Sequence, residues 1–249
     1  TTSRYTPGDD RAIRKIPEWF EYEGDGYLSR HSTLESNGDS LVDSYARIYE
    51  LSGSRMQVLP ARHSLSIVGS DKNLLIKQDT VSYIACQSPV ISGRWYVPAT
   101  VTSHDGGGRV QSTKEILIRD DYGNPIEIVT NHSEHVIYLW GYYGQRLVAQ
   151  IKGATYVEVE NALGTSPVSL SQLFSPVSTI SGLQARLPGA QVYTYTYHPY
   201  AGVDSETALN GQTTCYDYDA KGRLVKSYRT GENGKQEILQ LNNYHIINE

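Results

Sequence analysis

A short pattern that recurs along the chain limits its fold more than any other feature of the sequence. The pattern is an aromatic residue, an acidic residue, two variable residues, a glycine, a variable residue and an apolar residue. Its clearest copy is Tyr-Asp-Ala-Lys-Gly-Arg-Leu at 218–224, and weaker copies lie at 22–28, 119–125, 140–146 and 197–203. In the copy at 197–203, one extra residue precedes the glycine.

Such a pattern predicts a strand, a tight turn and a second strand. A carboxylate at the first turn position accepts hydrogen bonds from turn amides, and a glycine three residues later adopts a positive φ at little cost. The flanking aromatic and apolar side chains then pack across the hairpin. The residues assigned to this motif are Tyr218, Asp219, Gly222, Arg223 and Leu224, with weaker counterparts Asp120, Gly123, Trp140, Gly144, Tyr197 and Gly202.

The glycine spacing indicates that these hairpins form a repeat array. Gly123 and Gly144 are 21 residues apart, and Gly202 and Gly222 are 20 residues apart. One hairpin cannot bury its apolar face alone, so repeats of this length stack on their neighbours. We therefore predict a sheet that is assembled hairpin by hairpin.

The aromatic composition favours the same architecture. The chain has 20 Tyr but only 2 Phe, 3 Trp and 1 Met. Tyrosine suits half-exposed strands, because its ring packs across the sheet while its hydroxyl stays in water. Apolar stretches bounded by turn residues predict strands at 41–51, 64–69, 74–77, 81–86, 94–102 and 191–197, with a flexible hairpin tip at 105–108.

One segment, 154–188, interrupts the strand pattern. Thr155 and Glu158 fit a capping box, and Gly164 stands where a helix would end. The alternation of valine with glutamate at 157–160 also allows a strand there. We favour a helix at this point because both of its ends have a recognisable signal.

Two further helical signals follow in the same segment. Pro167 suits the first position of a helix. The residues expected to face inward are Leu170, Leu173 and Phe174, followed at helical spacing by Ile180, Leu183 and Leu187. Pro188 then ends the pattern. We predict two or three short helices between strands.

Two stretches resemble the YD repeats of the RHS-repeat family. Residues 118–163 contain Y-G-N-P, Y-L-W-G-Y-x-G-Q and A-T-Y-x-x-V in that order, and residues 187–229 contain T-Y-T-Y-x-P-x-x-G and Y-x-Y-D-x-x-G-R-L. This order is similar to the RHS variant common in Gram-negative gut anaerobes. The resemblance predicts a repeat region at 110–249 and a β-rich pre-repeat region at 1–109.

The resemblance implies a structural role. Repeats of this family build antiparallel sheets of hairpins, which form a shell or strip and carry no chemistry of their own. It implies a non-enzymatic scaffold segment of a secreted or cell-surface bacterial protein, whose partners are other repeats of the parent chain or a protein in a larger assembly. Part of a toxin-delivery protein is an alternative. Because the chain starts at Thr1 without Met and is too short to close a complete shell, we expect a piece of a longer protein.

Charge and motif content argue against several other classes. The net charge is −5 and no basic run occurs, so we expect no nucleic-acid partner. No apolar run is long enough for a transmembrane helix. The chain has no C-x-x-C pair, no G-x-S-x-G elbow and no phosphate-binding G-K-[ST] loop, so we expect no enzyme activity, cofactor or metal. Whether Cys86 and Cys215 form a disulfide stays open.

Some residues could serve chemistry but fit a structural role better. His132, Glu134 and His135 are metal-ligand types, yet they lie where a hairpin tip is expected. The carboxylate pairs at 9–10 and 120–121 could serve glycoside hydrolysis, which needs two carboxylates facing one sugar. Turn capping accounts better for the second pair, because it occupies the acidic position of the motif.

The aromatic residues leave a binding role open. Trp19, Trp95 and Trp140, together with the tyrosines, could form a platform for a sugar, although cross-strand packing explains them more simply. A surface binding module for a glycan or a protein partner is therefore the alternative to a scaffold. It would need contiguous exposed rings away from the repeat positions.

Overall fold

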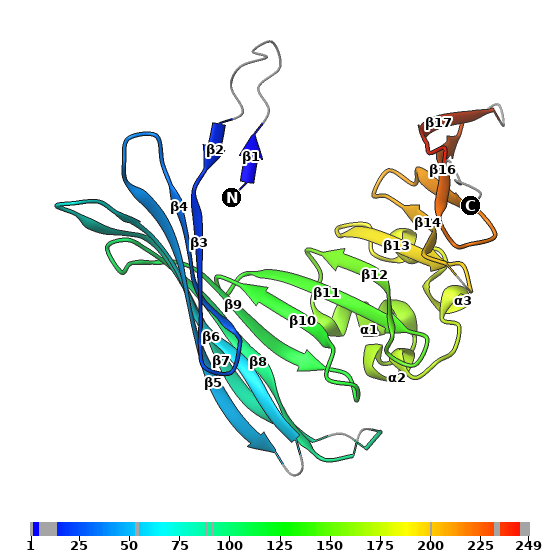
Figure 1. Cartoon of the computed structure of the whole chain (residues 1–249). Helices are drawn as coiled ribbons and strands as arrows, with labels where there is room; N and C mark the ends of the chain where they lie inside the picture. The colour runs from blue at the N-terminus through cyan, green and yellow to red at the C-terminus, as the bar shows by residue number, and fades with distance from the viewer. Residues whose placement is uncertain are drawn as a thin grey trace. The chain divides into compact units, whose positions relative to one another are not determined.

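The computed structural model describes residues 2–4, 14–52, 55–87, 89–90, 92–199, 201–231 and 235–244. Fifteen strands among them, from β3 (Glu18–Tyr22) to β17 (Gln236–Leu241), form one antiparallel sheet in which each strand pairs with its neighbours in sequence (Figure 1). Strands β1 (Thr2–Arg4) and β2 (Arg14–Ile16) pair with each other separately. The prediction of a mainly β, antiparallel fold with a small helical insertion is confirmed.

The chain divides into two compact units. Unit 1 comprises Thr1–Glu115 and Thr130–His132, and unit 2 comprises Ile116–Val129 and Ser133–Glu249. The boundary predicted between 109 and 110 falls at the start of β9 (Val110–Arg119), and the two units divide within that strand.

Unit 1 is a single layer of long strands. After β3 they are β4 (Leu28–Leu34), β5 (Ser40–Ser52), β6 (Arg55–Val68), β7 (Asn73–Gln87), β8 (Arg94–Asp105) and the first part of β9. Among the described residues of this unit, the apolar side chains that are buried are Val42, Leu59 and Val97. Few apolar side chains are buried because no helix or second sheet covers these strands within the described part of the unit.

Unit 2 has two layers. Its strands are β10 (Pro125–Thr130), β11 (Glu134–Gly141), β12 (Arg146–Lys152), β13 (Gln191–Tyr197), β14 (Val203–Thr207), β15 (Thr213–Tyr218), β16 (Leu224–Thr230) and β17. Its helices are α1 (Tyr156–Leu163), α2 (Pro167–Ser171), α3 (Val177–Ile180) and α4 (Leu183–Arg186), which lie against one face of the strands around β11 and β12 (Figure 1). None of the described helices is long and apolar enough to span a membrane.

The core of the described chain lies between these two layers. The sheet contributes side chains such as Ile126, Ile137, Leu139 and Ile151, each fully buried. The helices contribute a matching set, which comprises Val159, Leu163, Leu170, Ile180, Leu183 and Leu187. Burial on this scale stabilises unit 2, because each fully buried aliphatic side chain contributes roughly 1.5–3 kcal/mol relative to exposure.

Helix α1, the first of the insertion, begins and ends where its signals predict. The hydroxyl of Thr155 accepts a hydrogen bond from the N–H of Glu158, and the Glu158 carboxylate accepts one from the N–H of Thr155 at 2.8 Å. Gly164 ends α1 at φ +71°. The capping-box prediction is confirmed, and the strand alternative at 157–160 was wrong.

The later part of the insertion differs from the prediction. Four short helices form rather than two or three, because Gly182 adopts φ +69° and separates α3 from α4. Leu170 is fully buried, but Leu173 and Phe174 are 43% and 68% exposed. The expectation that both would face inward was wrong, since α2 ends at Ser171 and the helical face does not reach them.

Candidate functional site

Three turns have the geometry that the sequence motif predicts. In 105–109, 120–124 and 219–223, the first residue is Asp, and its N–H donates to the carbonyl four residues later at 2.9–3.0 Å. The N–H of the fourth residue, a glycine, donates back to the carbonyl of the aspartate at 2.9–3.1 Å. One oxygen of each carboxylate accepts the N–H groups of the third and fifth residues at 2.8–3.0 Å. We call these the Asp-first turns.

Three other turns have the same backbone hydrogen bonds, but the side chain that caps them stands at a different position of the turn. They are 23–27, 35–39 and 208–212, and their first residues are Glu23, Glu35 and Ala208. Here an Asp or Asn directly before the glycine accepts the N–H of the last turn residue at 3.0–3.1 Å. Only 23–27 overlaps a predicted copy of the motif. An Asn-Gly or Asp-Gly pair between apolar runs is a turn signal that would have identified the other two.

The glycine is required in all six turns because of its backbone angle. The φ values of Gly26, Gly38, Gly108, Gly123, Gly211 and Gly222 lie between +73° and +88°. This left-handed region costs residues with a side chain roughly 1–2 kcal/mol.

We predict that Gly222→Val lowers the stability of unit 2 by about 1–2 kcal/mol, since valine at φ +73° is strained. Lys221→Ala in the same turn should change stability little, because Lys221 is exposed and contributes its N–H rather than its side chain to the carboxylate of Asp219. Thermal unfolding of the two variants makes the comparison. Equal melting temperatures would contradict this account of the turn.

The copy at 140–146 adopts a different turn. Tyr142, Tyr143 and Gly144 have consecutive positive φ values of 54°, 58° and 72°. The N–H of Gly144 donates to the carbonyl of Ser171 at 2.8 Å, in the helical insertion, rather than to a residue of its own turn. The copy has glycine rather than an acidic residue at position 141, so no carboxylate caps this turn.

In the copy at 197–203, Gly202 has another function than the motif predicts. Ala201, not Gly202, donates its N–H to the carbonyl of His198, so the glycine lies one position after the reversal. A Cβ on Gly202 would lie 2.6 Å from the hydroxyl oxygen of Tyr218. Gly202 is therefore small so that the Tyr218 ring can approach the backbone.

The hairpins of unit 2 are joined by one recurring hydrogen bond. An aromatic side chain at or just beyond the end of a strand donates to a backbone carbonyl directly after the preceding turn on the same edge of the sheet. We call these side chains the aromatic ladder. The four bonds, donor first, are Trp140 to Pro125 (2.8 Å), Tyr197 to Leu147 (2.6 Å), Tyr218 to Val203 (2.8 Å) and Tyr244 to Leu224 (2.9 Å).

Ring contacts accompany these bonds. The guanidinium of Arg146 lies 4.8 Å from the centre of the Tyr197 ring, and that of Arg223 lies 4.4 Å from the Tyr244 ring. Such cation–π contacts contribute roughly 0.5–1 kcal/mol when exposed. Asn124, the last residue of the turn 120–124, donates from its Nδ2 to the carbonyl of Gly144 at 2.7 Å. The turns at 120–124 and 140–146 therefore touch directly, and Arg146 and Arg223 each contact an aromatic side chain of the following hairpin.

The surroundings of the ladder keep its tyrosines protonated and its capping aspartate ionised at neutral pH. Burial raises the pKa of Tyr197 and of Tyr218, so both hydroxyls remain donors at neutral pH. The backbone N–H and the guanidinium of Arg223 hold the pKa of Asp219 below its usual value. The Asp219 carboxylate therefore stays charged and keeps capping its turn.

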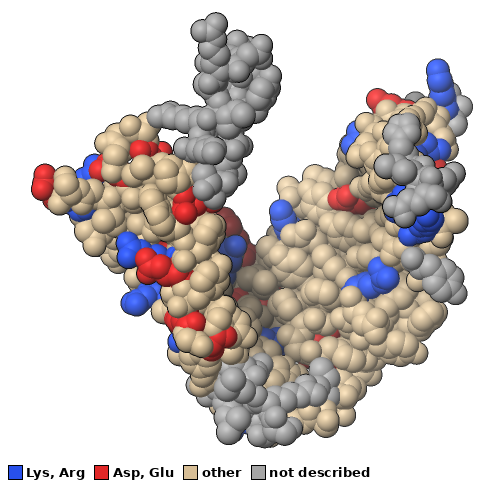
Figure 2. Space-filling view, in the orientation of Figure 1, with Lys and Arg blue, Asp and Glu red and all other residues tan. Residues whose placement is uncertain are grey.

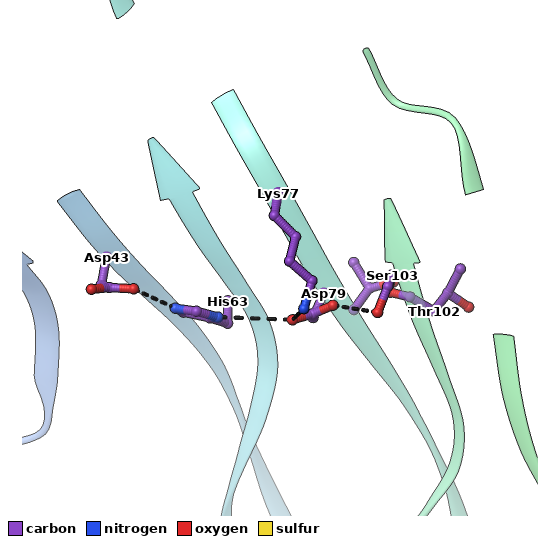
Figure 3. Close-up of polar contacts among 7 residues, drawn as sticks. Asp43, His63, Lys77, Asp79, Thr102 and Ser103 are labelled. Atoms are coloured by element: carbon purple, nitrogen blue, oxygen red, sulfur yellow. Dashed lines mark hydrogen bonds and ion pairs between the residues drawn. The ribbon is translucent and has the colours of Figure 1, made fainter. Parts of the chain in front are cut away.

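Unit 1 has a row of polar side chains that crosses four strands (Figure 3). His63 Nε2 lies 2.8 Å from an Asp43 carboxylate oxygen, and His63 Nδ1 lies 3.9 Å from Asp79. Asp79 also accepts from the Ser103 hydroxyl at 2.5 Å and pairs with the Lys77 ammonium at 2.8 Å. The sequence prediction missed this row, because its members are far apart in the chain and only the strand register aligns them.

The order of groups in this row does not match nucleophilic catalysis. An activated hydroxyl needs a base such as imidazole within hydrogen-bond reach. Here the carboxylate of Asp79 lies between His63 and Ser103 (Figure 3). Burial raises the pKa of Asp79, but the hydrogen bonds from the Lys77 ammonium and the Ser103 hydroxyl lower it by more, so that the pKa lies below its usual value. The Asp79 carboxylate is therefore a weak base.

We expect the contribution of Asp79 to stability to be lost in acid. Its folded-state pKa lies below the unfolded value of about 3.9, so the contribution is present above that pH and disappears as the pH falls through the folded-state pKa. Asp79→Asn should destabilise unit 1 by up to about 1 kcal/mol at pH 7, and the difference from wild type should shrink toward pH 2–3.

The exposed carboxylate Asp71 provides the control, since Asp71→Asn should have little effect at either pH. Urea unfolding at both pH values measures the difference. A destabilisation by Asp79→Asn that is the same in acid as at neutral pH would contradict the assignment.

The other predicted candidates lie in structural contacts. His132 pairs with Glu115 at 3.0 Å, and His135 pairs with the buried Glu127 at 2.8 Å, so the two histidines have different partners. Within the described ranges, no three His, Cys, Asp or Glu residues gather as a metal site. The pair at 9–10 lies outside the described residues.

The remaining candidates are accounted for as follows. Cys86 and Cys215 are free thiols. Trp19 is half exposed, and the Trp140 indole belongs to the aromatic ladder. Figure 2 shows acidic and basic side chains close together over unit 1. The ion pairs of this unit include Lys72–Asp39 at 2.7 Å and Lys77–Asp79 at 2.8 Å.

Comparison with known proteins yields no family. No family model and no curated protein matches the chain. Among solved structures, the Tc holotoxin pore of Photorhabdus luminescens with the mutation TccC3-D651A is similar over 93% of this chain and 12% of that one, at 11% identity and a TM-score of 0.34. A porin-like protein from Bacteroides uniformis is similar over 90% of this chain and 86% of that one, at 11% identity and a TM-score of 0.21. At these TM-scores, neither similarity assigns the chain to a family.

Proposed function

We propose that the chain is a non-enzymatic scaffold segment of a repeat-built protein of the RHS type. The observation that carries this proposal is the aromatic ladder, in which the same bond recurs from one hairpin to the next. In each bond, an aromatic side chain of one hairpin contacts the neighbouring hairpin rather than a ligand. Such nearest-neighbour contacts are how repeat proteins gain stability.

The single layer of unit 1 supports a place in a larger assembly. A sheet gains its stability by packing a face against another layer. In unit 1, apolar side chains such as Trp19, Phe20 and Leu74 are about half exposed. We propose that other repeats of the parent chain, or a second protein, cover part of this surface.

The last strand of unit 2 supports the same proposal. Every residue of β17 is exposed, and Ile238 and Leu241 are 57% and 62% exposed. As the final strand of the sheet, β17 has one edge without a described strand, and such an edge favours pairing with another chain segment. A secreted or cell-surface location is proposed from the sequence resemblance alone.

Native mass spectrometry of material purified gently from its source tests the proposal. We expect this sequence to occur within a much longer polypeptide, or always together with a partner protein. The opposite outcome is a stable, partner-free 27.7 kDa monomer. That outcome would overturn the scaffold proposal and favour a free-standing binding module.

A further inference from the structure

A cavity of about 490 Å³ lies beside the β11–β12 hairpin, within unit 2. Aromatic side chains from three segments line it: Tyr142 and Tyr143 from the hairpin, Phe174 from the helical insertion and Tyr197 from the end of β13. Its volume falls within the range of small-ligand sites, roughly 300–1,000 Å³. The aromatic ladder uses only one of these rings, that of Tyr197.

The backbone around this cavity is held in an unfavourable conformation. Tyr142 and Tyr143 both have positive φ, which is uncommon for residues with bulky side chains. The N–H of Tyr143 donates to the carbonyl of Leu173 at 3.3 Å, which holds the hairpin against the insertion. Gly141 permits this contact, because a Cβ there would lie 2.4 Å from Pro176. Strain of this kind is concentrated at ligand-binding sites, where the surrounding structure maintains it.

The rings form a continuous wall that solvent reaches. Tyr142 packs edge-on against Tyr197 and Phe174, with ring centres 5.8 and 6.1 Å apart, and Tyr143 lies 6.1 Å from Phe174. Tyr143 is 52% exposed and Phe174 is 68% exposed. Exposed rings that gather around a cavity offer flat apolar surface for stacking.

The cavity also has a cation available for a ligand. The Arg146 guanidinium faces the Tyr197 ring, and among the described residues no carboxylate lies within ion-pair distance of it. The residues that line the cavity include no Asp or Glu. The site therefore combines apolar walls with a positive group, and it favours a ligand that has both an apolar face and a negative charge.

We propose that this cavity binds a hexuronic acid unit of a glycan. The C–H face of a pyranose ring stacks on the exposed rings of Tyr143 and Phe174. The carboxylate on the same ring pairs with Arg146, whose planar guanidinium forms bidentate bonds to carboxylates. This role goes beyond the scaffold function, because it gives one hairpin of the array a ligand that the other hairpins do not bind.

Saturation-transfer NMR with two probes tests the proposal. Methyl β-D-glucuronide and methyl β-D-glucoside have the same ring. They differ in one substituent, which is a carboxylate in the glucuronide and a hydroxymethyl group in the glucoside. We expect millimolar binding of the glucuronide, with a preference on the order of tenfold over the glucoside, as one charge-assisted contact provides.

Three single substitutions separate the parts of the site. Phe174→Ala should abolish binding of both probes, Arg146→Gln should remove the preference for the glucuronide, and Arg146→Lys should retain part of it. Leu173→Ala is the matched control, since Leu173 is exposed beside Phe174 but does not line the cavity. The far-UV circular dichroism of each variant shows whether it folds.

Two outcomes would overturn the proposal. One is absence of glucuronide binding to a folded wild-type chain at millimolar ligand. The other is that both probes bind equally and that Arg146→Gln does not change their binding. This result would indicate a site for neutral sugars or a non-specific apolar site. Neither outcome bears on the native mass of the protein, so failure here is distinct from failure of the scaffold proposal.

Discussion

Replacement of Gly144 by alanine should destabilise unit 2 by about 2–4 kcal/mol, because it combines a left-handed backbone with overpacking. Gly144 has φ +72°, and a Cβ there would lie 2.3 Å from the ring of Tyr122. That ring belongs to the preceding turn, and the Cβ of Tyr122, whose position is fixed by the backbone, would itself lie 3.0 Å away, so rotation of the ring alone does not relieve the contact. Urea unfolding of unit 2, followed by the fluorescence of Trp140, measures the loss.

Gly164 provides a matched control for this substitution. It has nearly the same backbone angle, φ +71°, but no atom lies within 4 Å of a Cβ built on it. Gly164→Ala should therefore cost only the conformational part, about 1–2 kcal/mol. If the two variants were equally stable, the contact between successive turns would make no contribution, and the account of linked hairpins would lose one of its supports.

The second large effect should come from Leu170→Ala, which we expect to cost about 2–5 kcal/mol. Leu170 is fully buried between α2 and the sheet, and its truncation leaves a cavity under the helical insertion. Because the insertion also holds the β11–β12 hairpin through the carbonyls of Ser171 and Leu173, amide exchange in that hairpin should increase as well.

Leu173→Ala is the corresponding control, with the same chemical change at a side chain that is 43% exposed. It should cost less than about 1 kcal/mol, since little apolar contact is lost. Differential scanning calorimetry of both variants distinguishes the two sites. A similar loss for both would mean that the insertion does not pack on the sheet as described.

Local signals allowed the fold class and two of the three Asp-first turns, 120–124 and 219–223, to be predicted from the sequence. The third, 105–109, was expected only as a flexible hairpin tip, without the cap by Asp105. A carboxylate, a glycine three residues later and flanking apolar residues act within five positions, so the sequence contains the complete interaction. The same holds for α1, whose capping box is formed by Thr155 and Glu158. The Asx-Gly turns at 35–39 and 208–212 carry an equally local signal. The motif missed the first because Leu34 is not aromatic and Ser40 is not apolar, and it missed the second because Ala208 is not acidic.

The aromatic ladder could not be predicted in the same way. Its bonds join residues 15 to 50 positions apart, and the longest, from Tyr197 to Leu147, crosses the helical insertion. Only the register of β12 against β13 brings these two residues together. Sequence alone assigned the aromatic positions to packing and gave no indication of the carbonyl that each one binds.

Bulges and short helices account for the remaining differences. The polar row in unit 1 depends on a register that shifts between Leu65 and Ser66 and again between Ser82 and Tyr83. Such shifts move side chains relative to the neighbouring strand, so alternation within a strand does not predict cross-strand partners. The exposure of Leu173 and Phe174 likewise followed from a helix that ended after one turn, which helical spacing does not predict.

The free energy of unfolding of unit 2 in a double variant tests the central claim most directly. Tyr197→Phe with Tyr218→Phe removes two hydroxyls that bind carbonyls of preceding hairpins, and should cost about 1–3 kcal/mol in total. Tyr193→Phe with Tyr195→Phe removes two hydroxyls from the same sheet that belong to no ladder bond, and should cost less than about 1 kcal/mol. A clear difference between the two double variants is the predicted result. Equal stability would contradict the claim that the aromatic ladder joins the hairpins into one scaffold.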